Sequence, residues 1–219
     1  LNNRNTFWNQ SGATIEIVSP GDGFGDYGLN NDLNDSLFNA GLIHISHAAD
    51  DGIYNIGYIL NEATGTIVVD TAGVDHPGHG VYLLSGHPMV NHGAMIITGT
   101  SDDGLYNDAM FSNMSGAALQ ITNTSGCGVL NGPADLLENA GTLWISNAQQ
   151  YGLRNFGDVV NAAGGTLTIQ QSALDNLRNE FQDLIENHGT INLHNSGTTG
   201  IWNAGEILLK TGGILQVLQ

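Results

Sequence analysis

The sequence predicts an all-β protein, a parallel β-helix or β-solenoid of nine rungs, each about 24 residues long and built from three short strands. Three observations predict this fold: a glycine that recurs at a fixed interval, three columns of apolar residues in the same register, and a column of asparagines. All three patterns run along the whole chain. We therefore expect one solenoid domain over residues 1–219.

The recurring glycine sets the period of the repeat. The interval is 24 residues, with one of 28 and one of 48, along Gly28, Gly52, Gly80, Gly104, Gly128, Gly152 and Gly200. Asn176 divides the longest interval evenly, and asparagine commonly replaces glycine where φ must be positive. This residue is position 0 of each repeat, which puts Leu1 at position 1 of a first repeat with four extra residues.

Three columns, at positions 1, 15 and 17, are apolar in all nine repeats. Positions 15 and 17 flank an outward residue, as Leu143 and Ile145 flank Trp144, which is the period of a strand with one buried face. Positions 1 to 3 predict a second strand, and a third lies near positions 7 to 11. Nine coils that rise about 4.8 Å each give a rod of roughly 43 Å.

Position 3 is asparagine in eight of the nine repeats, and Leu83 is the exception. A buried asparagine needs partners for its amide hydrogens and its oxygen, and stacking identical side chains supplies them. We favour such an amide ladder over the alternative, eight separate Asx-turns. The members of this column are Asn3, Asn31, Asn55, Asn107, Asn131, Asn155, Asn179 and Asn203.

The third strand alternates between two registers. Odd-numbered repeats are apolar at position 7 with asparagine at 9, as in Ile59 and Asn61, whereas even-numbered repeats use positions 9 and 11, as in Leu37 and Asn39. A shift of two residues keeps the same face inward. The true unit is therefore a 48-residue pair of rungs, and we expect two turn shapes to alternate along one edge of the rod.

The overall charge limits the classes of partner. The formal net charge is −17 with only four lysines and arginines, which argues against nucleic acid and against anionic membrane surfaces. No apolar run approaches the roughly 18 residues of a membrane span, so we expect no membrane insertion. Neither end of the chain carries a recognisable cap, which predicts a segment of a longer array.

Catalysis is the first chemistry to consider, because many polysaccharide lyases are parallel β-helices that use a basic residue. Arg154 and Arg178 share position 2 on adjacent rungs, but no carboxylate pair stands clearly beside them. A solvated pair that relieves negative charge accounts for them. We therefore expect no catalytic residues and no enzyme activity.

Metal binding is the second chemistry. Two insertions of four residues, within Val18–Tyr27 and Asp70–His79, fall at the same corner, and solenoid loops often mark a binding face. His76 and His79 lack a third ligand for zinc, and we expect them to be exposed loop residues. We expect no cofactor, and calcium at clustered carboxylates is the alternative. The calcium candidates are Asp50, Asp51, Asp75, Asp102 and Asp103.

Position 2 carries aromatic side chains on the outer surface. Stacked exposed rings suit a sugar or a protein partner, while the alternative is that they only stabilise the sheet by cross-rung contact. Both roles can hold together. The candidate contact residues are Tyr54, Tyr82, Tyr106 and Trp202.

The phrase Gly-aliphatic-x-Asn-x-Gly, at residues 52–57 and 152–157, resembles repeats in very large secreted surface proteins of gliding bacteria. The resemblance implies a shaft or adhesive segment of an extracellular fibre or surface adhesin, such as a hook-like appendage that catches other cells. It implies contact with neighbouring repeats or a homo-oligomer, and with cell-surface glycans or proteins. The alternative function is a carbohydrate-binding or carbohydrate-cleaving β-helix module.

Overall fold

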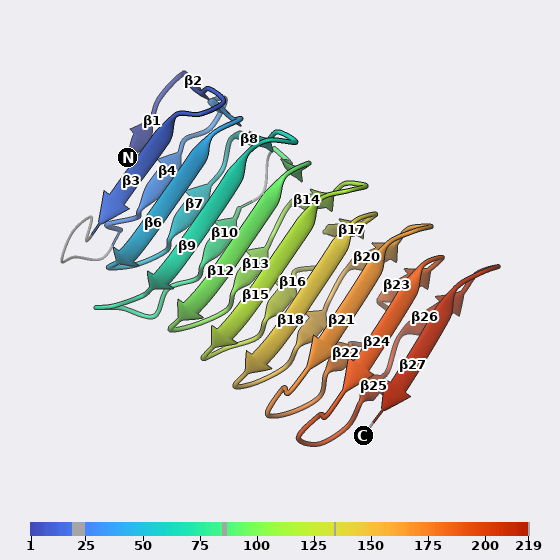
Figure 1. The fold of residues 1–219 in the computed structure, drawn as a ribbon. Coiled ribbons are helices and arrows are strands. Elements are labelled where there is room, and N and C mark those ends of the chain that lie inside the picture. Colours follow the sequence, from blue (N-terminus) through green and yellow to red (C-terminus); the bar gives the residue numbers. More distant parts are fainter. Residues whose placement is uncertain (19–24, 85–86, 134, 219) are drawn as a thin grey trace.

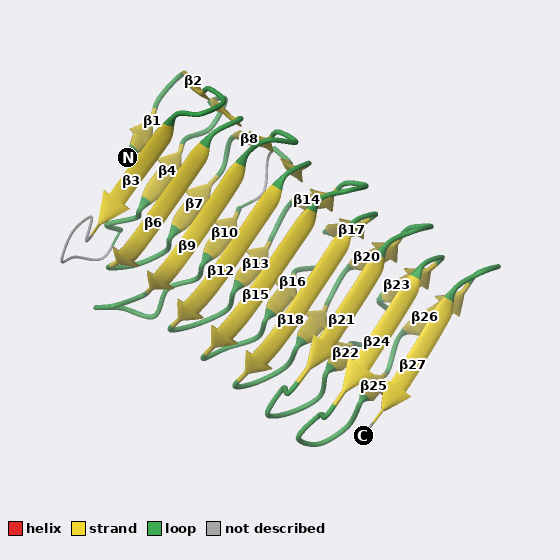
Figure 2. Cartoon of the chain, in the orientation of Figure 1, coloured by secondary structure: helices red, strands yellow, loops and turns green. Residues whose placement is uncertain are grey.

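The computed structural model is a rod of nine stacked rungs with the two termini at opposite ends (Figure 1). It describes residues 1–18, 25–84, 87–133 and 135–218. These residues form strands and loops and no helix (Figure 2). Each rung contributes one strand to each of three parallel sheets, and each sheet has nine strands. The predicted all-β solenoid is confirmed.

The first sheet holds β1 (Asn2–Asn3), β4 (Leu29–Asn31), β7 (Ile53–Asn55), β10 (Val81–Leu83), β13 (Leu105–Asn107), β16 (Val129–Asn131), β19 (Leu153–Asn155), β22 (Leu177–Asn179) and β25 (Ile201–Asn203). The second sheet holds β2 (Thr6–Asn9), β5 (Ser36–Asn39), β8 (Tyr58–Asn61), β11 (Met89–Asn91), β14 (Met110–Asn113), β17 (Leu136–Asn139), β20 (Asp158–Asn161), β23 (Leu184–Asn187) and β26 (Glu206–Leu209). The third sheet holds β3 (Thr14–Val18), β6 (Leu42–Ala48), β9 (Thr66–Ala72), β12 (Ala94–Thr100), β15 (Ala118–Thr124), β18 (Thr142–Ala148), β21 (Thr166–Gln170), β24 (Thr190–His194) and β27 (Ile214–Leu218).

The second sheet confirms the two-residue shift between odd and even rungs, because Met89 pairs with Ile59 and Asn91 with Asn61. In the second rung the link from first to second sheet has four residues and the link from second to third has two, whereas the third rung reverses the order. The alternation therefore occurs at two corners in opposite phase, not along one edge. The combined length of these two links is the same in both rungs.

The core is a continuous column of inward side chains along the rod axis. The predicted apolar columns supply most of it, and residues such as Ile45, Ile97 and Leu105 are fully buried. Burying one such side chain contributes roughly 1.5–3 kcal/mol. Because each rung covers its neighbours, the same contacts repeat along the chain.

The position-0 glycines correct one expectation. Among the described residues none of them has positive φ. A Cβ on Gly104 would collide with Ile121 Cγ2 and lie 2.7 Å from the carbonyl oxygen of Gly128 on the next rung. Glycine is therefore needed at position 0 for space, not for a left-handed conformation.

A column of left-handed residues lies instead at position 19, near the corner between the third and first sheets. Seven successive rungs have φ between 51° and 69° there. Few residue types favour this conformation, and asparagine and glycine fill four of the seven sites. The column holds His47, Thr71, Gly99, Asn123, Asn147, Gln171 and Asn195.

Candidate functional site

The asparagines at position 3 stack inside the rod as a hydrogen-bonded column. The Nδ2 of Asn31 donates to the Oδ1 of Asn55 at 2.7 Å, and also to the carbonyl oxygen of Tyr58 at 3.1 Å. The same amide–amide bond joins Asn3 to Asn31 and runs again from Asn107 to Asn203 at 2.7–2.8 Å. Each buried amide thus ties its own rung to the next.

A second asparagine column runs along the end of the second sheet. Its amide–amide bonds are 2.7–2.9 Å long and unbroken over eight rungs. From the sequence, these asparagines were predicted only as markers of the strand register. The signal for a ladder was present, because the two-residue shift aligns Asn9, Asn39, Asn61, Asn91, Asn113, Asn139, Asn161 and Asn187.

Leu83 interrupts the first column. The side-chain oxygen of Asn107 on the next rung is buried without a hydrogen-bond partner. On the preceding rung, the Nδ2 of Asn55 donates at 2.8 Å to the carbonyl oxygen of Gly57 in its own turn. An unsatisfied buried polar atom costs about 1–3 kcal/mol. The gap is therefore a local weak point in an otherwise repeated network.

Five polar residues gather at the corner between the third and first sheets, and we call this group the acidic corner: Asp50, Asp51, His79, Asp102 and Asp103. Asp51, His79 and Asp103 precede the position-0 glycine on three successive rungs. Asp51 Oδ1 accepts the backbone N–H of His79 at 2.7 Å, and Asp103 Oδ1 accepts the backbone N–H of Cys127 at 2.6 Å. These buried carboxylates therefore hold the backbone of the following rung.

Burial changes the acidity of this corner. It is the main cause that raises the pKa of Asp51 to about 6, with the neighbouring Asp50 and Asp102 adding to it. Burial likewise raises the pKa of Asp103 and of the free Cys127 thiol. The thiol is therefore held in its neutral form.

His79 corrects the expectation of an exposed loop histidine, since only 17% of its side chain is exposed. The preceding residue, Gly78, is bonded to the fourth rung and so fixes the position of His79. The Gly78 N–H donates to Ser101 Oγ at 3.0 Å, and the Gly78 carbonyl oxygen accepts from the Asp102 N–H at 3.1 Å. The ring lies 5.3 and 5.1 Å from the rings of Tyr82 and Tyr106. The inserted segment thus folds back onto the rod.

The acidic corner does not include every calcium candidate. Asp75 is exposed in the second insertion, where its backbone N–H donates to the carbonyl oxygen of Ala49. Asp50 Oδ2 accepts the backbone N–H of Gly25 at 2.9 Å. Most of the first insertion lies outside the described residues.

Tyrosine rings stack beside this corner, and we call Tyr27, Tyr54, Tyr82 and Tyr106 the tyrosine stack. Successive ring centroids are 4.5, 5.6 and 4.9 Å apart, the first pair parallel and the others edge to face. Burial is the main cause that raises the pKa of Tyr82 to about 12. The rings contact one another across rungs and are partly exposed to solvent. This geometry allows them both to stabilise the sheet and to contact a sugar or protein partner.

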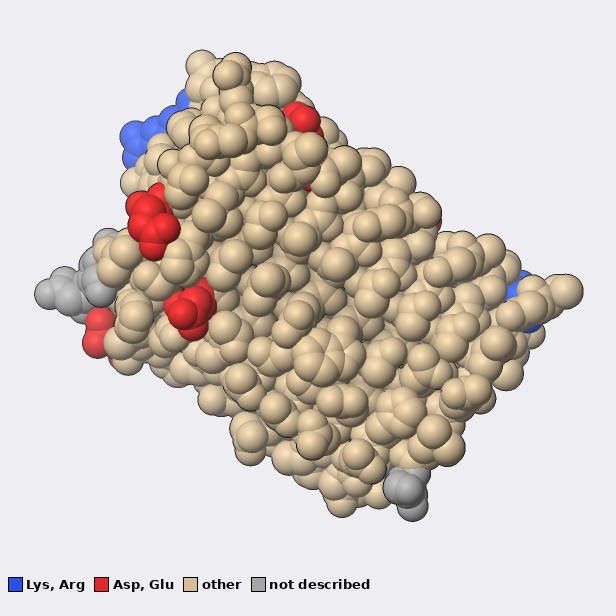
Figure 3. Space-filling model, in the orientation of Figure 1, with Lys and Arg blue, Asp and Glu red and all other residues tan. Residues whose placement is uncertain are grey.

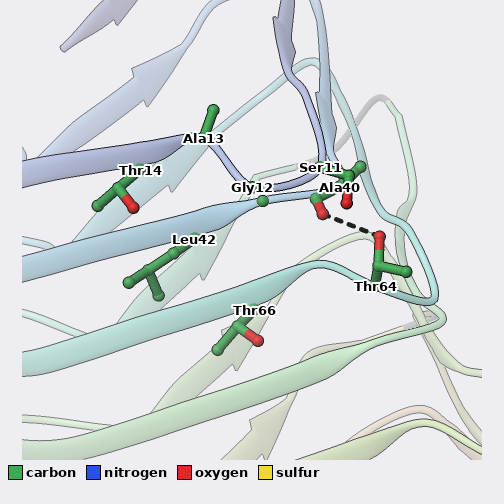
Figure 4. Close-up of a pocket in the computed structure, with 9 residues that line it drawn as sticks. Ser11, Gly12, Ala13, Thr14, Ala40, Leu42, Thr64 and Thr66 are labelled. Atoms are coloured by element: carbon green, nitrogen blue, oxygen red, sulfur yellow. Dashed lines mark hydrogen bonds between the residues drawn. The ribbon is translucent and has the colours of Figure 1, made fainter.

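A hollow of about 190 Å³ lies between the tyrosine stack and the acidic corner. It combines aromatic faces with carboxylates. Its lining residues are Tyr27, Asp50, Asp51, Tyr54, Pro77, His79 and Tyr82. A larger hollow of about 310 Å³ lies at the turn into the third sheet (Figure 4). It is lined by small side chains such as Ala13 and Thr64, and Thr64 Oγ1 donates to the carbonyl oxygen of Ala40 at 2.9 Å. None of the residues that line this larger hollow is titratable.

Trp202 is not part of the tyrosine stack. It lies on the last rung, where the Arg178 guanidinium sits 3.9 Å from its ring centroid. Arg154 and Arg178 each donate through Nε to Glu180 Oε1 at 2.8 Å. Glu180 was not predicted from the sequence, because it lies outside the recurring columns. The arginines are therefore bound to a carboxylate and an aromatic ring, not simply solvated.

The charged residues are unevenly distributed over the surface. The face shown in Figure 3 carries few charged side chains, and its acidic residues gather toward the N-terminal rungs. No helix of the described residues is long and apolar enough to cross a membrane.

Comparison with known proteins shows little similarity. No protein-family model matches the sequence, and no curated protein matches it. One solved structure, a hyper-glycosylated fragment of TibA modified by TibC, aligns over 99% of this chain and 97% of its own, at 14% identity and a TM-score of 0.22. So low a score leaves the function to be argued from the site itself.

Proposed function

We propose that this chain is a structural shaft or adhesive segment of an extracellular bacterial fibre or surface adhesin, acting in self-assembly or cell attachment. The observation that carries the proposal is the stacking of nine rungs in three continuous sheets, tied together by two columns of buried asparagines. Each rung contacts only its neighbours, so stability grows with repeat number. A rod of this kind spans distance without a large globular core.

The tyrosine stack and the acidic corner support an adhesive role. Rigid rings present large contact area at low entropic cost, and carboxylates accept hydrogen bonds from hydroxyls or pair with cationic groups. A cell-surface glycan or protein is the partner we propose, and the net charge of −17 disfavours nucleic acid.

Two further features support an extracellular, self-associating rod. The chain contains only four lysines and arginines, which leaves few sites for trypsin-like proteases. One face carries few charged side chains, which lowers the electrostatic cost of bringing two copies together (Figure 3). A homo-oligomer or contact with neighbouring repeats is therefore part of the proposal.

Binding of the labelled chain to bacterial cells and to a glycan array tests the adhesive role. We expect Tyr82→Ala to weaken binding at least about tenfold, because aromatic anchors commonly contribute 2 kcal/mol or more at an interface. Tyr58→Ala is the matched control, since Tyr58 lies on the second sheet beside Phe38. Equal loss in both variants, or no binding by the parent chain, would remove the adhesive half of the proposal.

A carbohydrate-binding or carbohydrate-cleaving module is the second candidate, favoured by the hollow beside the tyrosine stack. Its volume of about 190 Å³ is below the 300–1,000 Å³ typical of small-molecule pockets. Turnover assays on polysaccharides separate the two proposals. Cleavage that disappears in Arg154→Ala or Arg178→Ala would overturn the shaft proposal.

A further inference from the structure

The imidazole of His79 lies near two carboxylates from the next rung. His79, Asp102 and Asp103 each offer one ligand atom, and these atoms all lie within 4.8 Å of one another. His79 Nδ1 lies 3.7 Å from Asp103 Oδ2. The three side chains come from the inserted third rung and from the fourth rung.

The Nδ1 atom of His79 is buried and has no hydrogen-bond partner. A separation of 3.7 Å is longer than the 2.7–3.2 Å of an ordinary hydrogen bond to nitrogen. It is close to the roughly 3.3–3.6 Å between two ligands of a tetrahedral ion whose bonds are about 2.0–2.2 Å long. The distance between these two atoms therefore fits two adjacent ligands of one ion better than a hydrogen-bond donor and its acceptor.

We propose that His79, Asp102 and Asp103 bind a divalent transition-metal ion, with zinc as the best match. A nitrogen ligand with two carboxylates suits zinc, which takes three protein ligands and leaves a fourth position for water or a partner group. Calcium requires six to eight oxygen ligands, which this group does not supply.

The electrostatic surroundings favour a cation. None of the four lysine and arginine side chains forms an ion pair with Asp102 or Asp103, since their ion pairs lie with Asp32, Asp175, Glu180 and Glu186. Asp51 adds a third carboxylate from the rung below, holding the His79 backbone. Asp103 is buried and Asp102 is half-buried. Ionised carboxylates this close repel one another without a cation, and a bound ion removes that repulsion.

The ion would join the inserted corner to the rod. His79 ends the insertion of the third rung, whereas both aspartates belong to the fourth rung. Binding would thus fix the corner that borders the tyrosine stack. This inference goes beyond the proposed function and does not depend on it.

Equilibrium dialysis and calorimetry with zinc chloride, on chain first treated with a chelator, test the site. We expect one zinc per chain, with binding that weakens as the pH falls because the ligands must be deprotonated. Cobalt(II) in place of zinc should give visible absorption bands of a low-coordinate site.

The decisive variant is His79→Phe, which keeps a ring against Tyr82 and Tyr106 but removes the nitrogen ligand. Loss of even an outer-shell partner costs roughly 10–100-fold in metal affinity, so we expect at least about 100-fold here. His92→Phe is the matched control, because His92 is exposed in a turn of the fourth rung. Asp102→Asn gives an independent second loss if the phenylalanine variant folds poorly.

Three results would overturn the site. These are the absence of saturable zinc binding, unchanged affinity in both His79→Phe and Asp102→Asn, and a loss in His92→Phe as large as that in His79→Phe. Stoichiometric calcium binding without zinc binding is one form of the first of these results.

Discussion

At the scale of single residues, buried asparagines supply hydrogen bonds between rungs that a purely apolar core cannot supply. Each Nδ2 donates both to the next asparagine and to a backbone carbonyl, so one side chain satisfies several buried groups. An apolar residue in the same column removes the amide–amide bonds to both neighbours, as Leu83 does, and there it leaves the buried Asn107 Oδ1 without a partner. The cost of a substitution should therefore depend on what the adjacent rungs carry.

Exchanging the residues at two sites of this column tests that idea. Leu83→Asn gains amide bonds of about 1 kcal/mol each but loses the burial of a leucine, so we expect a net change within about 1 kcal/mol. Asn131→Leu removes the amide–amide bonds to Asn107 and Asn155 and the bond to the carbonyl oxygen of Asp158, and it should destabilise the fold by about 3 kcal/mol or more. Chemical denaturation of both variants measures the difference. Equal destabilisation by the two substitutions would contradict the ladder.

The buried carboxylate of Asp51 makes stability depend on pH. Its pKa is raised to about 6 in the folded chain from 3.8, so the folded state holds a proton that the unfolded state has released between those values. Stability from this group is therefore greatest below about pH 4 and falls as the pH rises to about 6.

Thermal unfolding between pH 4 and pH 7 in the presence of a chelator measures this effect. We expect Asp51→Asn to flatten the decline, because its side-chain oxygen still accepts the His79 N–H while no charge is buried. A variant whose melting temperature follows the same pH profile as the parent would show that another group causes the decline.

At the scale of strands and turns, the columns could be predicted from the sequence. Equivalent positions on stacked rungs have the same surroundings, so the same type of residue recurs there. Positions 15 and 17 and the shift of the second sheet were predicted for this reason. The burial of His79 could not be predicted, since it depends on how the four inserted residues fold back. Glu180 was missed because it contacts the arginines across a turn rather than down a column.

Two classes of glycine in the turns should respond differently to alanine. A Cβ on Gly128 would collide with Ile145 Cγ2 and lie 2.7 Å from the carbonyl oxygen of Gly152, whereas a Cβ on Gly164 would meet no atom within 4 Å. Gly164 has φ +84°, so its alanine variant should lose only the roughly 1–2 kcal/mol of a left-handed alanine.

For Gly128→Ala we expect a loss of about 3 kcal/mol or more, because the backbone of the next rung must shift. Urea denaturation of the two variants measures the two losses of stability. A larger loss for Gly128→Ala means that glycine is needed at position 0 because a side chain would not fit there, not because the backbone is left-handed. A smaller loss for Gly128→Ala than for Gly164→Ala would mean that the rungs separate easily.

At the scale of the whole molecule, the rod is a one-dimensional array whose rungs are joined by similar contacts on both sides. Its distinctive surface features are local, since the tyrosine stack, the acidic corner and the second insertion share one corner of the N-terminal half. Three hollows of the described residues, lined by residues between Ser11 and His87, lie in that half as well. This division suits a shaft that bears a contact site on its side.

The most direct test of the shaft is to pull the chain from its two ends in a single-molecule force experiment. We predict stepwise unzipping in units of one rung, each releasing about 75–80 Å, since 24 residues extend to about 80–86 Å and the rung already spans about 4.8 Å. The Asn131→Leu variant should lower the force of the steps near its rung. Unfolding of the whole chain in a single low-force event, without rung-sized steps, would contradict a load-bearing solenoid.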